Sequence, residues 1–223
     1  MVKIAVPSNS SAGPARASTT APAAPGATRL STPDGSQFSV AEVSQDILIP
    51  PFTIIYDQQE GAPYRFSGIR ADADKNYRPL VIRTVKRHLA TGDYTIEGME
   101  DRLTVERKSL SDLYNTLGQG RERFEREHQR MAAMVQAGGF ACVLVESSLE
   151  EALLRPPLES GLLPKTVDRT RISWAMKYGV PWFFEESRRR AEVTCYRILE
   201  KAWEREQERL KAEQQEQASG RLF

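Results

Sequence analysis

The chain has 223 residues, and its 31 Lys and Arg residues nearly balance its 30 Asp and Glu residues, which leaves a net charge of +1. This balance excludes a protein that coats DNA through overall positive charge, so nucleic-acid binding must come from local patches. Two cysteines exclude a disulfide framework, and no apolar run is long enough to span a bilayer. The apolar start is too short for a signal peptide, so we expect an intracellular, cytoplasmic protein without a membrane segment.

The N-terminal residues 1–46 are rich in Ser, Thr, Ala, Pro and Gly and contain few large apolar residues. Such a segment cannot bury enough surface to offset the entropy lost on ordering, so the sequence predicts a disordered tail. A partner-binding arm is the alternative. A folded domain is expected over residues 47–214, followed by a flexible C-terminal end over residues 215–223.

The first half of the folded domain is predicted to consist mainly of strands. Apolar runs rich in β-forming residues predict strands at 51–56 and 80–85. The intervening residues 62–79 lack apolar periodicity and indicate a long loop, either functional or locally disordered. Residues 88–96 and 102–108 are expected to pair as a hairpin.

The second half alternates helices with strands. A helix is expected to begin at Ser109, because Asp112 three residues on completes a capping box, and a second helix is expected over 121–136. The uninterrupted apolar run 140–145 predicts a central strand covered on both faces. Residues 148–164 indicate no clear element. The remaining elements are a helix over 165–178, an edge strand over 180–184 and a long helix over 186–214. This order predicts an α/β sandwich around a mixed β-sheet flanked by helices.

Three side chains of the predicted hairpin point to metal-assisted hydrolysis. Glu106 and Lys108 lie two residues apart on a strand and therefore project from the same face, and Asp93 comes from the preceding strand region. Two carboxylates and an ammonium suit a divalent cation and an activated water. We expect Asp93 and Glu106 to bind Mg²⁺ or Mn²⁺, with a backbone carbonyl near Arg107 as a further ligand. Lys108 would position the water, and Asp57 would extend the acidic cluster. This is the general PD-(D/E)xK nuclease scheme.

A longer set of motifs adds a family resemblance. The motifs are, in chain order, Gly92-Asp93-Tyr94, Val105-Glu106-Arg107-Lys108, Asp112-Leu113 and Gly120-Arg121. Through them the chain resembles the nuclease domain of the XPF family of structure-specific endonucleases over roughly residues 50–150. The later elements fit the same fold through about residue 212.

The resemblance implies a restriction-endonuclease-like fold that cuts DNA near a branch or flap with Mg²⁺ or Mn²⁺. The residues that it carries over are Asp93, Glu106 and Lys108 as catalytic, Arg107 and Asp112 as supporting, and Asp57 as the Asp of a family Asp-x-Arg-Glu motif. Gln59 stands where that motif has Arg, and Arg65 and Arg70 are candidates to replace its phosphate contact. The chain shows no helix-hairpin-helix or helicase region, as in single-domain forms carried by phages and mobile elements.

Several residues have two interpretations. Arg121 matches a family position near the active site and is a candidate phosphate contact, or it belongs to a solvated helix face. Asp112 is either a helix-capping residue or a functional one. Lys86 and Arg87 precede the catalytic hairpin and either contact DNA or serve as ordinary surface residues.

The leading interpretation is a metal-dependent DNA endonuclease acting on branched or flap-containing duplexes in phage or bacterial recombination, replication or repair. One alternative is a non-catalytic DNA-binding subunit that needs a partner, for which Gln59 is the sequence support. Another is a nuclease of different preference, such as a nickase or an RNA-directed enzyme. A homodimer is a further hypothesis, because relatives in the family dimerise through this domain.

Overall fold

The computed structural model describes residues 29–31, 37–39 and 47–220. Within residues 1–45, a compact unit of its own, β1 (Arg29–Ser31) pairs antiparallel with β2 (Gln37–Ser39). The predicted disordered tail over residues 1–46 otherwise lies outside the described residues and stays a prediction. The domain from residue 46 onward forms the second unit.

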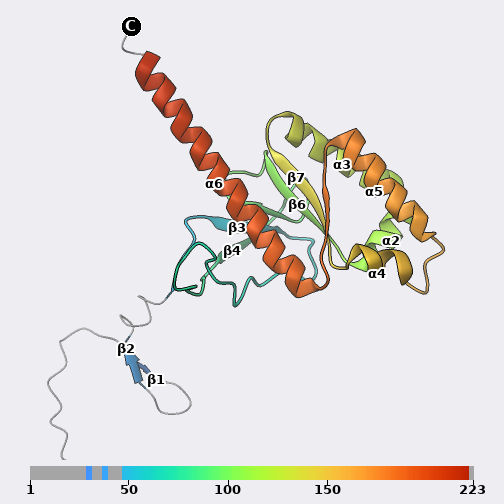
Figure 1. Ribbon diagram of the computed structural model, residues 1–223, viewed down its shortest axis with the longest axis horizontal. Helices are drawn as coiled ribbons and strands as arrows, with labels where there is room; N and C mark the ends of the chain where they lie inside the picture. The colour runs from blue at the N-terminus through green and yellow to red at the C-terminus, as the bar shows by residue number, and fades with distance from the viewer. Residues whose placement is uncertain (1–28, 32–36, 40–46, 221–223) are drawn as a thin grey trace, which may run out of the picture. The chain divides into compact units, whose positions relative to one another are not determined.

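The second unit is built on a six-stranded mixed sheet of order β4-β3-β5-β6-β7-β8 (Figure 1). Its strands are β3 (Thr53–Asp57), β4 (Arg83–Arg87), β5 (Tyr94–Ile96), β6 (Leu103–Lys108), β7 (Phe140–Val145) and β8 (Trp182–Phe184). β5 runs antiparallel to both β3 and β6, whereas the β3–β4, β6–β7 and β7–β8 pairs are parallel. The predicted mixed sheet is confirmed, and β8 is the edge strand that the sequence predicted.

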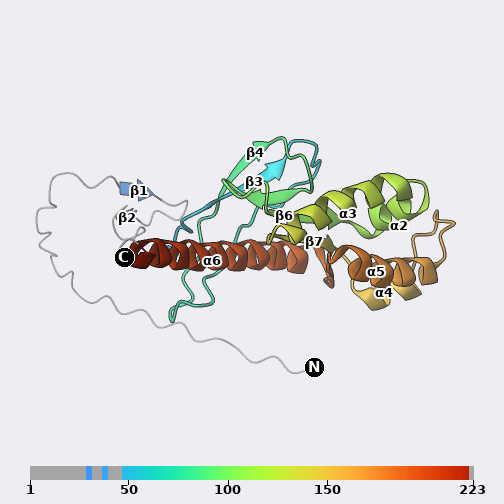
Figure 2. The ribbon, with the colours of Figure 1, turned by 90° about the horizontal axis from the view of Figure 1, so that it is seen from above.

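Helices cover both faces of this sheet. They are α2 (Leu110–Gly118), α3 (Arg121–Gln136), α4 (Leu149–Leu154), α5 (Pro164–Tyr178) and α6 (Arg188–Gly220). Helices α2, α3 and α5 pack on one face, and α6 packs on the other and continues past the sheet (Figures 1 and 2). None of the helices within the described ranges combines the length and the apolar character needed to cross a membrane.

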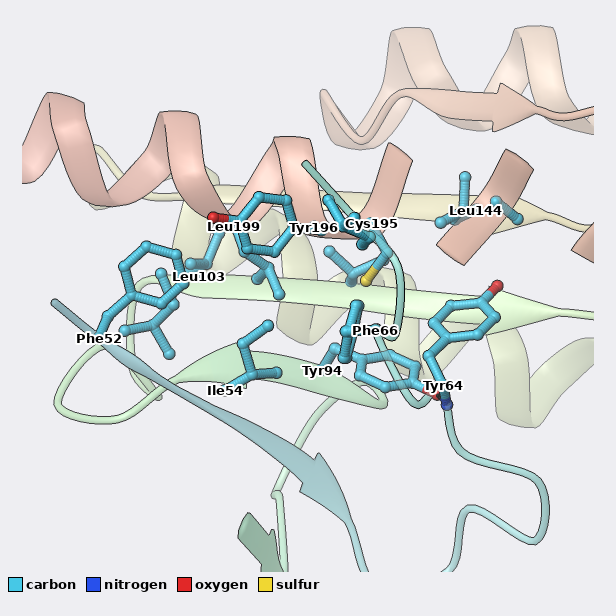
Figure 3. Packing of buried hydrophobic residues seen from close by; sticks show 14 of the residues in the cluster. Phe52, Ile54, Tyr64, Phe66, Tyr94, Leu103, Leu144, Cys195, Tyr196 and Leu199 are labelled. Carbon is cyan, nitrogen blue, oxygen red and sulfur yellow. Dashed lines mark hydrogen bonds between the residues drawn. The ribbon is translucent and has the colours of Figure 1, made fainter. Parts of the chain in front are cut away.

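Strand β7 shows why its sequence lacks polar alternation. Cys142 and Leu144 belong to the core beneath α6, whereas Ala141, Val143 and Val145 belong to the core beneath α2, α3 and α5. Because both faces of β7 are covered, both sets of side chains are apolar. The α6-side core appears in Figure 3, where Cys195, Tyr196 and Leu199 of α6 lie over the sheet.

The long loop between β3 and β4 is part of this core rather than a disordered segment. Tyr64, Phe66 and Ile69 are at most 3% exposed. The Tyr64 ring stacks on Tyr94 of β5 with ring centroids 5.0 Å apart, and Phe66 contacts the same ring edge-on (Figure 3). The loop therefore closes one side of the α6-side core.

Some element boundaries differ from the sequence prediction. Strand β4 begins at Arg83, because Leu80 bonds to Ile69 and bridges to Leu48. Residues 88–93 form an irregular turn with bends at 90–93 rather than the first arm of a hairpin, and Gly92 in it has φ +72°, outside the range of a regular strand. The unassigned stretch 148–164 contains the short helix α4, and α6 continues past the predicted end at 214 to Gly220.

Candidate active site

The three residues predicted to be catalytic lie together at the floor of one cleft. Glu106 and Lys108 project from the same face of β6, and the Lys108 ammonium donates a hydrogen bond to the Glu106 carboxylate. Asp93 precedes β5, and its Oδ2 accepts the backbone N–H of Arg107 at 2.7 Å. Glu106 is only 3% exposed. A carboxyl group with so little exposure is not part of a solvated surface pair.

The cleft itself has a volume of about 590 Å³. It lies between the turn 88–93, the end of β6 and one side of α2 and α3. Among the residues that line it are Asp57, Asp93, Glu106, Lys108, Asp112 and Glu127. The lining of this open groove thus carries more acidic than basic side chains, the basic ones being Arg107, Lys108, Arg123 and Arg130.

A glycine allows Asp93 to reach the cleft floor. Gly92 has a positive φ of +72°, and a Cβ at this position would lie 1.9 Å from the Thr104 Oγ1 of β6. Any other residue would be strained and would collide with that strand. The Thr104 hydroxyl also donates to the Thr91 carbonyl at 2.9 Å, which fixes the turn against β6.

Burial shifts the protonation of the acidic floor. It raises the pKa of Glu106 to about 7; the nearby Lys108 ammonium opposes this rise, and the Glu127 carboxyl adds to it. Burial and the charge of Glu106 also raise the pKa of Asp93 well above its usual range. Burial alone would lower the pKa of Lys108, but the neighbouring Glu106 carboxylate raises it above its ordinary value. The site therefore concentrates more carboxyl groups than one ammonium neutralises, which favours a bound cation.

The donor set fits a hard divalent ion. Within residues 29–31, 37–39 and 47–220, no three His, Cys, Asp or Glu side chains are gathered as a ready-made metal cage. Mg²⁺, however, keeps several waters and takes about one or two carboxylates from a protein. Asp93 and Glu106 supply two carboxylates on the same cleft floor and so fit such an ion.

Arg107 points away from this cluster, to the other face of β6. Its guanidinium binds both oxygens of Glu146 at 2.7 and 2.8 Å and also binds Glu60 at 3.1 Å. Arg188 of α6 donates to the same Glu146 at 2.9 Å. Burial alone would lower the pKa of Arg107, but the bridge to Glu146 raises it. Only the Arg107 backbone N–H contacts the predicted catalytic set, so its side chain supports the site from behind.

Asp57 and Asp112 line the cleft, but other groups already bind their carboxylates. The two Asp57 oxygens accept the backbone N–H groups of Leu89 and Gln59, each at 2.8 Å. The Ser109 hydroxyl accepts the Asp112 N–H at 3.1 Å and donates to the Asp112 carboxylate at 2.6 Å. Ser109 is thus the N-cap of α2, and the Asp112 carboxylate binds the Ser109 side chain. Metal binding by Asp57 and a functional role of Asp112 stay predictions.

The cleft lining does not include the five predicted DNA-contacting residues. Arg121 packs between helices, with its guanidinium 3.0 Å from the Thr170 hydroxyl and 5.0 Å from the centre of the Trp174 ring. The other four are exposed elsewhere: Arg65, Lys86, Arg70 (bonded to the Tyr77 carbonyl) and Arg87 (paired with Glu97 and Glu100). Arg121 is the first residue of α3, and its side chain points toward Thr170 and Trp174 of α5.

Three other residues of α3 face the cleft and were not singled out from the sequence. Arg123, Glu127 and Arg130 follow the spacing i, i+4, i+7 and therefore form one stripe. The sequence contained a signal for this stripe, because Arg123, Glu127 and Arg130 each come one position before a buried residue of α3. Those buried residues are Phe124, His128 and Met131. Read alone, the alternating charges of α3 indicate a solvated face.

An aromatic cluster lies directly behind the cleft. The Lys108 ammonium is 4.9 Å from the centre of the Phe124 ring, and His128 contacts that ring edge-on. Trp182 donates its indole N–H to His128 Nε2 at 3.2 Å. His128 is fully buried, and burial lowers its pKa to about 4. It is a packed core histidine.

Comparisons with known proteins place this site in a family. The ERCC4 domain matches residues 57–196. No curated protein matches the sequence. Two solved structures of XPF from Aeropyrum pernix, the second in complex with DNA, align with TM-scores of 0.49 and 0.48 at 15% and 16% identity. They cover 66% and 70% of this chain. The chain in turn spans 63% and 66% of the length of those two, just under two thirds.

The family match includes the three residues predicted to be catalytic, Asp93, Glu106 and Lys108, and also Asp57, Arg107 and Asp112. It also contains the strands and helices that build the cleft and more than half of the whole sequence. The chain therefore belongs to the ERCC4 domain family and contains an XPF-type nuclease domain.

Proposed function

We propose that this protein is a Mg²⁺- or Mn²⁺-dependent endonuclease that hydrolyses phosphodiester bonds in DNA at branched or flap-containing duplexes. The observation that carries the proposal is the buried set of Asp93, Glu106 and Lys108 on the floor of an open cleft. We further propose that its context is phage or bacterial recombination, replication or repair, as the resemblance to single-domain forms suggests.

The carboxylates of Asp93 and Glu106 would hold the ion. When bound, a divalent ion polarises the phosphate and makes its bound water a better nucleophile near neutral pH. Burial raises the pKa values of both carboxyl groups because it disfavours their charged forms. A bound cation would stabilise those charged forms by balancing their charge.

Lys108 would act on the phosphate that is being cut. Its ammonium stays protonated, because its partner Glu106 raises its pKa against the effect of burial. The bond to Glu106 and the Phe124 ring 4.9 Å away hold the ammonium at the cleft floor. There it orients the attacking water and offsets the charge that develops on the phosphate oxygens.

Arg123 is our candidate for a contact with the DNA backbone. It is exposed on α3 and lines the cleft, whereas Arg121 is engaged with Trp174 and Thr170. A guanidinium at the rim of an acidic cleft suits a phosphate next to the one being cut. Arg123 would supply the phosphate contact of the Arg in the family Asp-x-Arg-Glu motif, a position that Gln59 occupies here.

The experiment that tests the proposal compares wild type with Glu106→Gln on labelled flap, splayed-arm, four-way-junction, linear and single-stranded DNA, with Mn²⁺ and then Mg²⁺. We expect cutting confined to branched DNA and lost by at least about 100-fold in the variant, because even outer partners of metal ligands cost about 10–100-fold. Glu122→Gln, an exposed acid on α3 outside the cleft, is the matched control and should cut like wild type.

Full activity of Glu106→Gln would refute the site. Equal cutting of linear duplex would refute the branch preference, and preferential cutting of an RNA version would identify a different substrate. Tight binding of branched DNA without cutting in either metal would favour a partner-dependent subunit. Light scattering of the same protein at micromolar concentration tests the proposed homodimer, which a monomeric mass would contradict.

A further inference from the structure

The turn that carries Asp93 into the cleft is held from two sides. On the side of β6, the Thr104 hydroxyl binds the Thr91 carbonyl, and Gly92 lies directly against Thr104. On the side of α3, the Glu127 carboxylate accepts the Gly92 N–H at 3.4 Å, and Arg130 Nε donates to the Thr91 hydroxyl at 3.1 Å. The helix therefore contacts the two residues immediately before Asp93.

Glu127 also lies beside the other proposed metal ligand. Glu106 and Glu127 line the same cleft, and the Glu127 carboxyl adds to the rise in the pKa of Glu106. Glu127 and Arg130 are three residues apart and share the cleft-facing side of α3. One α3 side chain thus binds the backbone next to Asp93 and lines the same cleft as Glu106.

We propose that Glu127 is a positioning residue of the active site, which fixes the Asp93 turn relative to Glu106, and that Arg130 is the second anchor of that turn. This inference rests on the proposed function, because the two groups that it positions are the proposed metal ligands. Groups that hold metal ligands in orientation matter nearly as much as the ligands themselves.

The need for such an anchor follows from the backbone. Gly92 is required for its positive φ, but glycine also has the greatest backbone freedom of any residue. Asp93 is fixed by its own N–H to Val105 and by the Arg107 N–H on its carboxylate. The Gly92 N–H, by contrast, has Glu127 as its acceptor. Removing that acceptor frees the turn one residue before the ligand.

The test uses the full chain and four variants: Glu127→Ala, Glu127→Gln, Arg130→Ala and the control Glu122→Ala. The first readout is hydrogen exchange of the Gly92 amide in metal-free protein, resolved by NMR. We expect Glu127→Ala to speed this exchange by about tenfold, since it removes the acceptor of one hydrogen bond. Arg130→Ala should have a smaller effect in the same direction. Glu127→Gln keeps an acceptor oxygen and should match wild type, as should Glu122→Ala.

The second readout separates positioning from general damage. On whichever DNA the wild type cuts, Glu127→Ala should lower kcat by about 10–100-fold and leave KM for DNA within about threefold. Glu127→Gln should keep at least about a third of wild-type kcat, because rescue by the amide requires only the acceptor. Thermal melting verifies that each variant is folded. If Glu127→Ala does not fold, the two single variants Glu127→Gln and Arg130→Ala test the proposal.

Unchanged Gly92 exchange and unchanged kcat in Glu127→Ala would overturn the proposal. So would a loss in Glu127→Gln as large as in Glu127→Ala, because the charge rather than the hydrogen bond would then matter. If the wild type cuts no substrate yet Gly92 exchange speeds up in Glu127→Ala, the proposed function fails and the positioning role stands. If the wild type cuts DNA and Gly92 exchange is unchanged in Glu127→Ala, the proposed function stands and the positioning role of Glu127 fails.

Discussion

Glu106 lies between Lys108 and Glu127, and burial raises its pKa from an ordinary value of 4.5 to about 7. The folded protein therefore holds this proton more tightly than the unfolded chain does. A raised pKa of this kind contributes stability that is fully present below about pH 4.5 and lost as the pH rises through about 7. The metal-free protein should thus become less stable across that range.

The neutral variant Glu106→Gln isolates this effect. In a chelator, we expect it to be more stable than wild type at pH 8 by about 1–3 kcal/mol, because one pKa unit corresponds to about 1.4 kcal/mol. The difference should shrink toward zero at pH 5, where wild-type Glu106 carries its proton. Denaturant unfolding at both pH values measures the gap, and an equal gap at pH 5 and pH 8 would contradict this account. Added Mn²⁺ should stabilise wild type but not the variant.

At the level of single residues, the period of a strand predicted part of the site. It places Glu106 and Lys108 on one face, and the same rule places Arg107 on the other, where the structure has it. What the period cannot supply is the phase of a helix relative to a neighbouring element. The family resemblance points to Arg121 on α3, whereas the arginines of that helix that line the cleft are Arg123 and Arg130.

At the level of elements, the ion pairs of Arg107 join segments that are distant in the chain. Glu60 comes from the loop after β3, Glu146 follows β7, and Arg188 opens α6. The Arg107, Glu60 and Glu146 side chains are at most 11% exposed, so water does little to weaken the bridges among them. The backbone of Arg107 holds Asp93, and the network behind it therefore also steadies the cleft.

Removing one partner of this network should be costly. We expect Glu146→Ala to lower the free energy of unfolding by about 3–5 kcal/mol, because it leaves the Arg107 guanidinium buried and only partly paired. Glu159→Ala, at an exposed loop position, is the control and should change stability by less than about 0.5 kcal/mol. Urea unfolding monitored by circular dichroism measures both, and a loss below about 1 kcal/mol in Glu146→Ala would refute the role of the network.

Elements with a strong period were predicted closely, and irregular ones were not. The bounds of α3 and β7 match the sequence prediction, since a helical stripe and an uninterrupted apolar run are unambiguous. Helix α4 has only six residues and is too short to show a period. The loop between β3 and β4 has no period either. Its order comes from aromatic contacts of Tyr64 and Phe66 with Tyr94, which a local pattern cannot indicate.

At the level of the whole molecule, the chain divides into two compact units, and the family match lies entirely within the second. The cleft, both cores and all three predicted catalytic residues belong to residues 46–223. The α/β fold and the mixed sheet were predictable, because the order of strong elements restricts the architecture. The structure of most of the N-terminal segment lies outside the described residues.

We therefore expect a variant that lacks residues 1–46 to keep the fold and the activity. Its Tm should stay within about 2 °C of the full chain, because the residues of both described cores belong to the second unit. Its kcat on the preferred DNA should be equal to that of wild type within about twofold, which covers ordinary assay scatter between related variants. Calorimetry and single-turnover cutting measure these values. A collapsed Tm or a loss of cutting would show that the N-terminal segment completes the domain or contacts the substrate.

The aromatic cluster behind the cleft has an optical consequence. Trp174 and Trp182 each lie within 6 Å of the Phe124 ring, which itself contacts the Lys108 ammonium. The third indole, Trp203, packs beside Phe52 in the opposite core. Two of the three tryptophans are thus separated from the Lys108 ammonium by a single ring. Tryptophan emission of the unlabelled protein should report the arrival of a metal beside Glu106 or of a phosphate at Lys108, with Trp203 as a constant background.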